Sequence, residues 1–217
     1  MTNLKEWNNY WNKSNTLFGK ICHFFRISFI SKYVKYILDK YFPQEGIFVD
    51  CGSGSSETSI KLRKYKRYYI ALDISKKALL LSKKVKTIDG EINADILALP
   101  FKNKSVDGIW NLGVMEHFTE EEITLILNEF YRVLKKGSYA ILFWPPAFGL
   151  ATMILNSFEF ITNKVLKMNV WIRPEEKMQI KSIGHIKRLI NKTKFSLYNL
   201  HFSYRDLFTH LVIVCRK

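Results

Sequence analysis

The chain has 217 residues, of which 47% are hydrophobic, 15% aromatic and 24% charged. This composition excludes a disordered or collagen-like chain, and the length suits one domain with a sizeable core. The three cysteines are scattered and form neither a disulfide framework nor a metal-binding pair, so we predict no metal site and a cytoplasmic location. Residues 1–13 are polar, and we expect no secretory signal there.

The charge is strongly basic, with 34 Lys and Arg against 19 Asp and Glu, which gives a net charge of +15. It is uneven: residues 151–217 carry 12 basic and 4 acidic side chains, whereas residues 101–150 carry 5 and 6. Such a surface could attract nucleic acid or anionic lipid, although lysine-rich surfaces also simply keep enzymes in solution.

Hydrophobic periodicity predicts alternating helices and strands. The predicted order is helix 28–42, strand 47–50, helix 56–65, strand 68–73, helix 76–85, strands 88–94 and 106–111, helix 120–135, strand 139–144, helices near 150–167 and 184–192, and strands 195–203 and 210–215. The last two strands are close enough to pair as an antiparallel hairpin. We therefore expect an α/β fold with a Rossmann-like, seven-stranded, mostly parallel sheet, helices on both faces and a C-terminal antiparallel hairpin.

In such a sheet, ligands bind at the carboxyl ends of the strands. The first strand ends in a glycine-rich turn made of Asp50, Cys51, Gly52, Ser53 and Gly54. Its two glycines allow a tight turn and a close approach of a ligand to the backbone. Glu57 stands where the dinucleotide fingerprint requires a third glycine, and its charge would repel a pyrophosphate. No phosphate-loop lysine follows either, so the turn favours a ligand without phosphates.

Two further acids end the next two strands. Asp73 lies 23 residues after Asp50, close to the ~20-residue offset of a ribose-binding acid. Asp95 could accept a hydrogen bond from an adenine amino group, with Ile74 and Ile96 offering apolar faces to the ring. Each acid alone could be a helix cap or a surface residue. Together, the three acids indicate a ligand with adenine, ribose and a positive charge.

These segments resemble class I S-adenosylmethionine-dependent methyltransferases of the methyltransferase type 11-like group. The resemblance covers roughly residues 45–146. It rests on the segments VDCGSGS (49–55), ALDIS (71–75), NADILALPF (93–101), SVDGIWNLGVMEHF (105–118) and YRVLKKGSYAILFWPP (131–146). Two positions depart from the family pattern: Ser56 replaces a frequent third glycine, and Lys136-Gly137-Ser138 replaces a Pro-Gly-Gly turn. Both positions affect loop packing more than chemistry.

The resemblance implies that the cofactor is S-adenosylmethionine and its product S-adenosylhomocysteine. Asp73 would hold the ribose, Asp95 would face the adenine, and the two glycines of the turn would lie along the methionine portion. The backbone of Asn111 and Leu112 would contact the methionine amine. The implied cofactor-binding residues are Asp50, Cys51, Gly52, Ser53, Gly54, Asp73, Ile74, Asp95, Ile96, Asn111 and Leu112.

The segment from Trp7 to Trp11 resembles the aromatic N-terminal lid of many such enzymes, and its simpler interpretation is a helix packed on the core. In the lid interpretation, Trp11 is the expected neighbour of the cofactor. We divide the chain into an N-terminal helical lid, 1–44, and a class I methyltransferase domain, 45–217. An apolar helical insertion on the acceptor side covers about 147–192.

His117 follows the fourth strand, and its ordinary pKa suits a general base that takes a proton from the acceptor. The alternative is that Glu116 and His117 order the loop and the cofactor, which we favour because no second base is evident nearby. His185, His201 and His210 lie outside the matching segments and receive no role.

Two unusually apolar segments, 17–42 and 147–172, lie outside the matching core. They could cover the sheet edge, form a dimer interface, line an apolar acceptor pocket, or rest on a membrane surface as basic amphipathic helices. We therefore predict a methyltransferase for a small, apolar or lipid-like acceptor. Peripheral membrane contact is one of the possible roles of the two apolar segments. An RNA methyltransferase that uses the basic surface, and a binding module with a degenerate cofactor site, stay open as alternatives.

Overall fold

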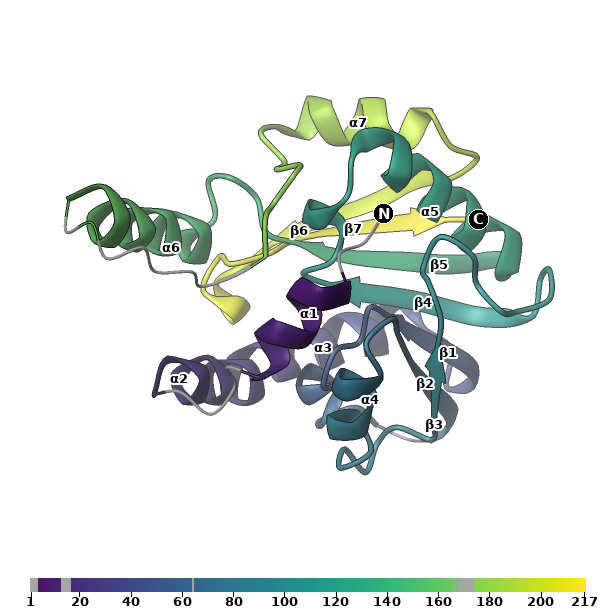
Figure 1. The fold of residues 1–217 in the computed structure, drawn as a ribbon. Coiled ribbons are helices and arrows are strands. Elements are labelled where there is room, and N and C mark those ends of the chain that lie inside the picture. The colour runs from purple at the N-terminus through teal and green to yellow at the C-terminus, as the bar shows by residue number, and fades with distance from the viewer. Residues whose placement is uncertain (1–3, 13–16, 64, 166, 168–173) are drawn as a thin grey trace.

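The computed structural model describes residues 4–12, 17–63, 65–165, 167 and 174–217, and its centre is a seven-stranded sheet with helices on both faces (Figure 1). The strands are β1 Glu45–Cys51, β2 Lys66–Asp73, β3 Gly90–Asn93, β4 Val106–Leu112, β5 Leu134–Trp144, β6 Ser196–Phe202 and β7 Leu211–Arg216. The α-helices are α1 Leu4–Asn12, α2 Leu17–Phe25, α3 Ser31–Tyr41, α4 Lys76–Ser82, α5 Glu120–Val133, α6 Leu150–Phe160 and α7 Ile183–Asn191. Shorter helical turns are η2 Arg26–Ile30, η3 Glu57–Ser59, η4 Met115–His117, η5 Ile161–Val165 and η6 Tyr204–Asp206.

The strand order is β3-β2-β1-β4-β5-β7-β6. Strands β1 to β5 run parallel, whereas β7 pairs antiparallel with both β5 and β6. The predicted α/β fold with a C-terminal antiparallel hairpin is therefore confirmed. The order reverses between β1 and β4, and this switch point is where open α/β sheets bind their ligands.

Both faces of the sheet are covered by apolar layers, which explains why the central strands read as nearly continuous apolar runs. On one face, buried Ile37 and Leu38 of α3 pack with Phe48 and Trp110. On the other face, Phe130 of α5 belongs to a buried cluster that also takes in α7. The sheet is thereby held rigid, and its strand ends provide a fixed platform for a site.

The predicted helix over 56–65 is wrong, because only the short turn η3 forms there. Ser56 adopts a left-handed φ of 55°, and its hydroxyl contacts the Ser82 hydroxyl at 2.7 Å. The Ser59 hydroxyl donates to Asp50 at 3.1 Å. These serine side chains form hydrogen bonds outside their own segment, and they compete with helix formation.

Strand β5 begins at Leu134, directly after α5, although the sequence predicted helix to 135 and strand from 139. Gly137 lies inside this strand at φ +82°, and its N–H donates to the carbonyl of Lys217 at 2.9 Å. Gly137, two residues past the predicted end of the helix, is therefore paired with the last residue of the sequence. In the part of the chain that the structure describes, no helix is long and apolar enough to cross a membrane.

Candidate cofactor site

The glycine turn after β1 is shaped by two residues in the left-handed region, Gly52 at φ +77° and Gly54 at φ +54°. A Cβ on Gly52 would lie 2.6 Å from the Val114 side chain, and one on Gly54 would lie 2.5 Å from the Trp11 ring. The N–H of Gly52 donates to the carbonyl of Leu72 at 2.7 Å. The turn therefore needs glycine both for its backbone conformation and for the closeness of its neighbours.

Asp73, at the end of β2, holds this turn in place. Its Oδ2 accepts from the N–H of Gly54 at 2.8 Å, and its Oδ1 accepts from the N–H of Ser75 at 2.8 Å. Burial raises the pKa of the Asp73 carboxyl, while these backbone hydrogen bonds act in the opposite direction. Each carboxylate oxygen accepts more than one hydrogen bond, so Asp73 keeps capacity for ligand hydroxyls.

Asp50 lies beneath the same turn and is only 2% exposed. Burial raises its pKa to about 7; the Ser59 hydroxyl opposes this rise and the nearby Asp73 charge adds to it. Cys51 beside it is fully buried. Both side chains are buried beneath the turn. A cation bound on the other side of the turn would favour the ionised form of Asp50.

Glu57 follows the turn, and its carboxylate contacts basic groups of the N-terminal helices. Arg26 Nη1 lies 3.2 Å from Glu57 Oε2, and His23 Nδ1 lies 2.9 Å from Oε1. Arg26 also donates to the Tyr10 hydroxyl at 3.4 Å. These contacts connect α2, η2 and α1 to the segment after the glycine turn.

Asp95 follows β3, and its Oδ1 accepts from the N–H of Leu97 at 3.0 Å, which forms a tight turn. Ile96 next to it is buried, and Ile74 after β2 is half-buried. The side-chain amide of Asn93 donates to the carbonyl of Ile74 at 2.8 Å. The ends of β2 and β3 are therefore joined where the sequence predicted the adenine.

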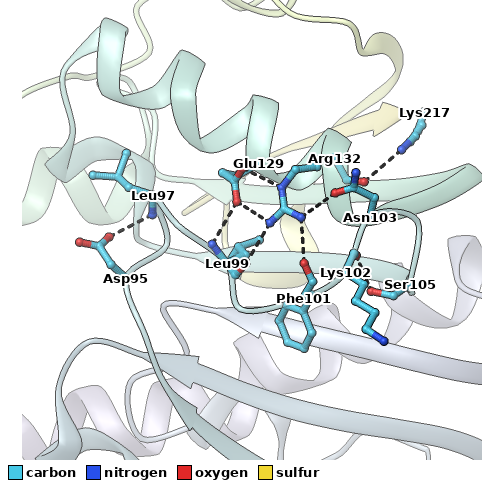
Figure 2. A network of polar contacts seen from close by, with 10 residues as sticks. All are labelled: Asp95, Leu97, Leu99, Phe101, Lys102, Asn103, Ser105, Glu129, Arg132 and Lys217. Atoms are coloured by element: carbon cyan, nitrogen blue, oxygen red, sulfur yellow. Dashed lines mark hydrogen bonds and ion pairs between the residues drawn. The ribbon is translucent and has the colours of Figure 1, made fainter.

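The loop after Asp95 is fastened to α5 by one guanidinium group, as Figure 2 shows. Arg132 donates to the carbonyls of Leu99 at 2.9 Å and Phe101 at 2.8 Å, and to Asn103 Oδ1 at 2.8 Å. Glu129 pairs with Arg132 and accepts from the N–H of Leu99 at 3.1 Å. The hydrogen bond from Arg132 lowers the pKa of Glu129.

Polar atoms near the turn have hydrogen-bonding capacity that the described part of the chain does not use. The Ser53 hydroxyl and both amide atoms of Asn111 are buried without a protein partner among the described residues. Leaving such atoms unsatisfied costs about 1–3 kcal/mol each. A ligand rich in hydroxyl, amine and carboxylate groups fits this need, and Leu112 at the end of β4 is partly exposed beside it.

Helix α1 lies across the carboxyl ends of the strands (Figure 1). Trp11 touches Gly54, Asn8 accepts from the Ser75 hydroxyl at 2.8 Å, and the Trp7 ring lies edge-on to the His117 ring at 4.9 Å. One short helix thus reaches the ends of β1, β2 and β4.

His117 belongs to η4, and its ring is held by neighbouring groups. Its Nδ1 lies 2.8 Å from the carbonyl oxygen of Glu175, so Nδ1 is the donor in this contact. Its Nε2 lies 3.9 Å from Glu116 Oε1. A proton taken up by this ring would therefore go to Nε2.

A second histidine at this edge received no role from the sequence. His210 precedes β7, whose Leu211 pairs with Trp144 at the carboxyl end of β5. Its Nδ1 lies 3.1 Å from Oδ2 of the fully buried Asp206, and the Thr209 hydroxyl lies 2.8 Å from the same nitrogen. The Asp-x-x-x-His spacing is a weak signal, because only the turn at η6 brings the two side chains together.

Comparisons with known proteins agree with this geometry. A family model described as a methyltransferase domain matches residues 49–142, while no curated protein matches the chain significantly. A structure from Methanococcus maripaludis, described as a putative S-adenosyl-L-methionine-dependent methyltransferase, is 19% identical, with a TM-score of 0.64 over 99% of this chain and 93% of that one. A putative methyltransferase from Haloferax volcanii, solved with the activator Trm112, is 16% identical, with a TM-score of 0.69 over 97% of both chains.

A third similar structure is the geranyl diphosphate C-methyltransferase of Streptomyces coelicolor, solved with S-adenosyl-L-homocysteine, Mg²⁺ and geranyl-S-thiolodiphosphate. It is 14% identical, with a TM-score of 0.57 over 85% of this chain and 75% of that one. The family match to a methyltransferase domain covers residues 49–142, which include the glycine turn and the ends of β1, β2, β3 and β4. The similar structures share the Rossmann-like fold of this chain.

Proposed function

We propose that the protein transfers a methyl group from S-adenosylmethionine to a small, apolar or lipid-like acceptor. The observation that carries this proposal is the apolar surface at the carboxyl edge of the sheet. There, α6 follows β5 and exposes Met153, Ile154, Phe158 and Phe160. An acceptor with an apolar body suits such surroundings, whereas a highly charged one gains nothing from them.

The cofactor is proposed to lie over the ends of β1, β2, β3 and β4. Asp73 accepts hydrogen bonds from ribose hydroxyls, and Asp95 faces the adenine between Ile74 and Ile96. The glycine turn with Asp50, Cys51 and Ser53 lies under the methionine portion, and the backbone of Asn111 and Leu112 receives its amine. Trp11 covers the turn from the α1 side. S-adenosylmethionine supplies the activated methyl group, and the residues around it orient the acceptor and exclude water.

Proton removal is needed only where the acceptor is a hydroxyl or a protonated amine. His117 would take the proton at Nε2, because its Nδ1 contacts the Glu175 carbonyl. The competing role for His117 is to order α1 through its contact with Trp7. The Streptomyces coelicolor enzyme of similar fold is named for geranyl diphosphate, whose geranyl chain is apolar, and this agrees with an acceptor that has an apolar body.

Two measurements test the proposal. Calorimetric titration should show binding of S-adenosylmethionine, and no binding would support the degenerate binding module instead. Incubation with methyl-tritiated S-adenosylmethionine should then label the organic-soluble fraction of a total lipid extract. Label in bulk tRNA or rRNA, with none in the lipid fraction, would overturn the apolar acceptor in favour of the RNA alternative.

A further inference from the structure

An apolar rim runs along one side of the molecule, and we define it by three pieces. These are α2 with η2, the turn 202–208 between β6 and β7, and residues 148–165 containing α6. In Figure 1, α2 and α6 both project past the edge at which β4 and β5 end. The large exposed apolar side chains of the rim are Phe24, Phe29, Phe148, Leu150, Met153, Ile154, Phe158, Phe160, Ile161, Val165, Phe202, Leu207 and Phe208.

The turn 202–208 packs against the start of the α6 piece, and η6 within it also lies close to η2. The Phe202 ring lies 5.5 Å from the Phe148 ring and 5.3 Å from the Phe208 ring. The N–H of Leu150 donates to the carbonyl of Phe208 at 3.1 Å, which fixes the start of α6 to this turn. Leu207 and Phe208 both have left-handed φ values, 56° and 55°. Bulky residues rarely adopt this conformation, so the turn holds its apolar side chains outward at a cost in backbone strain.

Residues 150–165 carry large apolar side chains over much of the helix surface, and most of these side chains are exposed. Among the described side chains of this segment, only Thr152 and Thr162 are buried. A helix with a wide apolar face normally buries that face against another element or in lipid. An exposed apolar patch of this extent marks an interaction surface.

The charge around the rim is basic. Residues 17–32 contain Lys20, Arg26 and Lys32 but no acid, and residues 150–167 contain Lys164 and Lys167 against Glu159. The four lysines are exposed. The neighbouring carboxylate of Glu57 contacts Arg26 and His23, and the Asp206 carboxylate is fully buried. A partner that binds the rim would therefore combine apolar groups with negative charge.

We propose that the apolar rim docks on the surface of an anionic membrane. The apolar side chains of α2, α6 and the turn 202–208 would enter the acyl boundary, and the lysines would contact the headgroups. This inference rests on the proposed function, because the rim lies at the edge where a lipid-like acceptor would enter. It adds the source of that acceptor, which is the bilayer itself.

A second copy of the chain suits the rim less well. A two-fold interface buries the same patch of both subunits, so it would gather the lysines of two rims where Glu159 is the one acid of each pair of helical pieces. The two helices also project separately, as Figure 1 shows, and a fluid bilayer accommodates separate projections more easily than a second folded chain does. RNA would match the lysines but would leave the aliphatic side chains of α6 in water.

Sedimentation with vesicles tests the docking directly. The full chain should bind vesicles of phosphatidylcholine mixed with phosphatidylglycerol, and should bind pure phosphatidylcholine at least about tenfold more weakly. High salt should weaken binding to the anionic vesicles, since the Debye length shrinks from ~10 Å at 0.1 M to ~3 Å at 1 M. Equal binding to both vesicle types, or binding to neither, would overturn the inference.

The variant Ile154→Asn/Phe158→Asn should lower vesicle affinity by about tenfold or more, because two apolar side chains leave the bilayer. Its matched control is Leu80→Asn/Leu125→Asn on α4 and α5, where Leu125 is as exposed as Ile154, at 58%.

The role of charge is tested separately. Lys164→Gln/Lys167→Gln should weaken binding to anionic vesicles, whereas Lys136→Gln at the amino end of β5 should not. Equal losses in a rim variant and its control would contradict the assignment.

Two further measurements separate this inference from the proposed function. Calorimetry with S-adenosylmethionine should give the same affinity for the wild type and both rim variants, so a failed cofactor site is recognised independently of docking. Light scattering should show one mass over the protein concentrations used. A dimer that the Ile154→Asn/Phe158→Asn variant disrupts, without vesicle binding by the wild type, would assign the rim to a second copy and overturn membrane docking.

Discussion

The proposed cofactor site, over the ends of β1 to β4, and the apolar rim lie at the same end of the sheet but are built in opposite ways. Around the turn after β1, hydrogen bonds fix the backbone, and Asp73 accepts from the N–H groups of both Gly54 and Ser75. In α6, by contrast, Thr152 is the only buried side chain among the described residues, and most of the large apolar side chains are exposed. The difference is that the glycine turn is held by hydrogen bonds of the chain itself, whereas the apolar side chains of α6 are left exposed.

The largest expected effect is on the free energy of unfolding, and it concerns Asp50 beneath the glycine turn. Its folded pKa, about 7, is raised above the unfolded value of ~3.9, so the native state binds more protons between these values. Stability from this group is therefore greatest below pH ~4 and falls by up to about 4 kcal/mol as pH rises to 7. Urea unfolding should show that Asp50→Asn is more stabilising, relative to the wild type, at pH 8 than at pH 4. An equal difference at both pH values would contradict the raised pKa.

The next effect is on cofactor affinity at Asp73. Asp73→Ala removes the acceptor of two backbone hydrogen bonds and the proposed partner of the ribose. We expect S-adenosylmethionine to bind about 30-fold more weakly or worse, since hydrogen bonds to charged groups contribute about 1.5–3 kcal/mol. Glu45→Ala, at the amino end of β1, is the control in the same titration and should bind normally. Unchanged affinity in Asp73→Ala would remove the ribose role.

A smaller effect is expected where α1 touches the glycine turn. Gly54→Ala places a Cβ 2.5 Å from the Trp11 ring at a φ of +54°. Cofactor affinity should fall about tenfold, because α1 is displaced in addition to the backbone strain of about 1–2 kcal/mol. In a Trp11→Ala background the same substitution should cost clearly less. A double-mutant cycle by calorimetry measures this coupling, and strict additivity would show that Trp11 does not press on the turn.

The smallest effect concerns the loop that carries Asp95. Arg132→Lys loses the fork that holds Leu99, Phe101 and Asn103, and should destabilise the fold by about 1 kcal/mol at pH 7. Arg132 depresses the pKa of Glu129, so the share of this stabilisation that comes from the ion pair is present above the unfolded value of ~4.3 and disappears as pH falls through the folded pKa. Thermal unfolding of both proteins at pH 7 and pH 3 should therefore show a smaller difference at pH 3. An undiminished difference at pH 3 would assign the effect to the hydrogen bonds with the carbonyls of Leu99 and Phe101 rather than to the ion pair.

The sequence was sufficient for the sheet and for the polar residues at its edge. The strands and the acids at their carboxyl ends could be predicted, because apolar runs and glycine turns are formed by residues that are neighbours in the sequence. The helix predicted over 56–65 failed because the hydroxyls of Ser56 and Ser59 bond to distant residues. The pair of Asp206 and His210 was missed for a similar reason, since its geometry depends on a turn with two left-handed residues outside any motif.

The apolar segments were recognised in the sequence, but what covers them was left open. Periodicity separates apolar from polar positions, and it does not say whether an apolar face meets the core or the outside. Only the placement of α2 and α6 beyond the sheet distinguishes these outcomes. The roles of the cofactor residues, of Trp11 and of His117 remain predictions for the experiments above.

The contacts of Glu57 with Arg26 and His23 also have a thermodynamic meaning. They join α2, a piece of the rim, to the segment that follows the glycine turn, so any coupling between the two would pass through these contacts. If vesicles alter the affinity for S-adenosylmethionine by some factor, then linkage requires the cofactor to alter vesicle affinity by the same factor. One ion-pair cluster would then let an enzyme that carries its methyl donor stay longer on the surface that holds its acceptor.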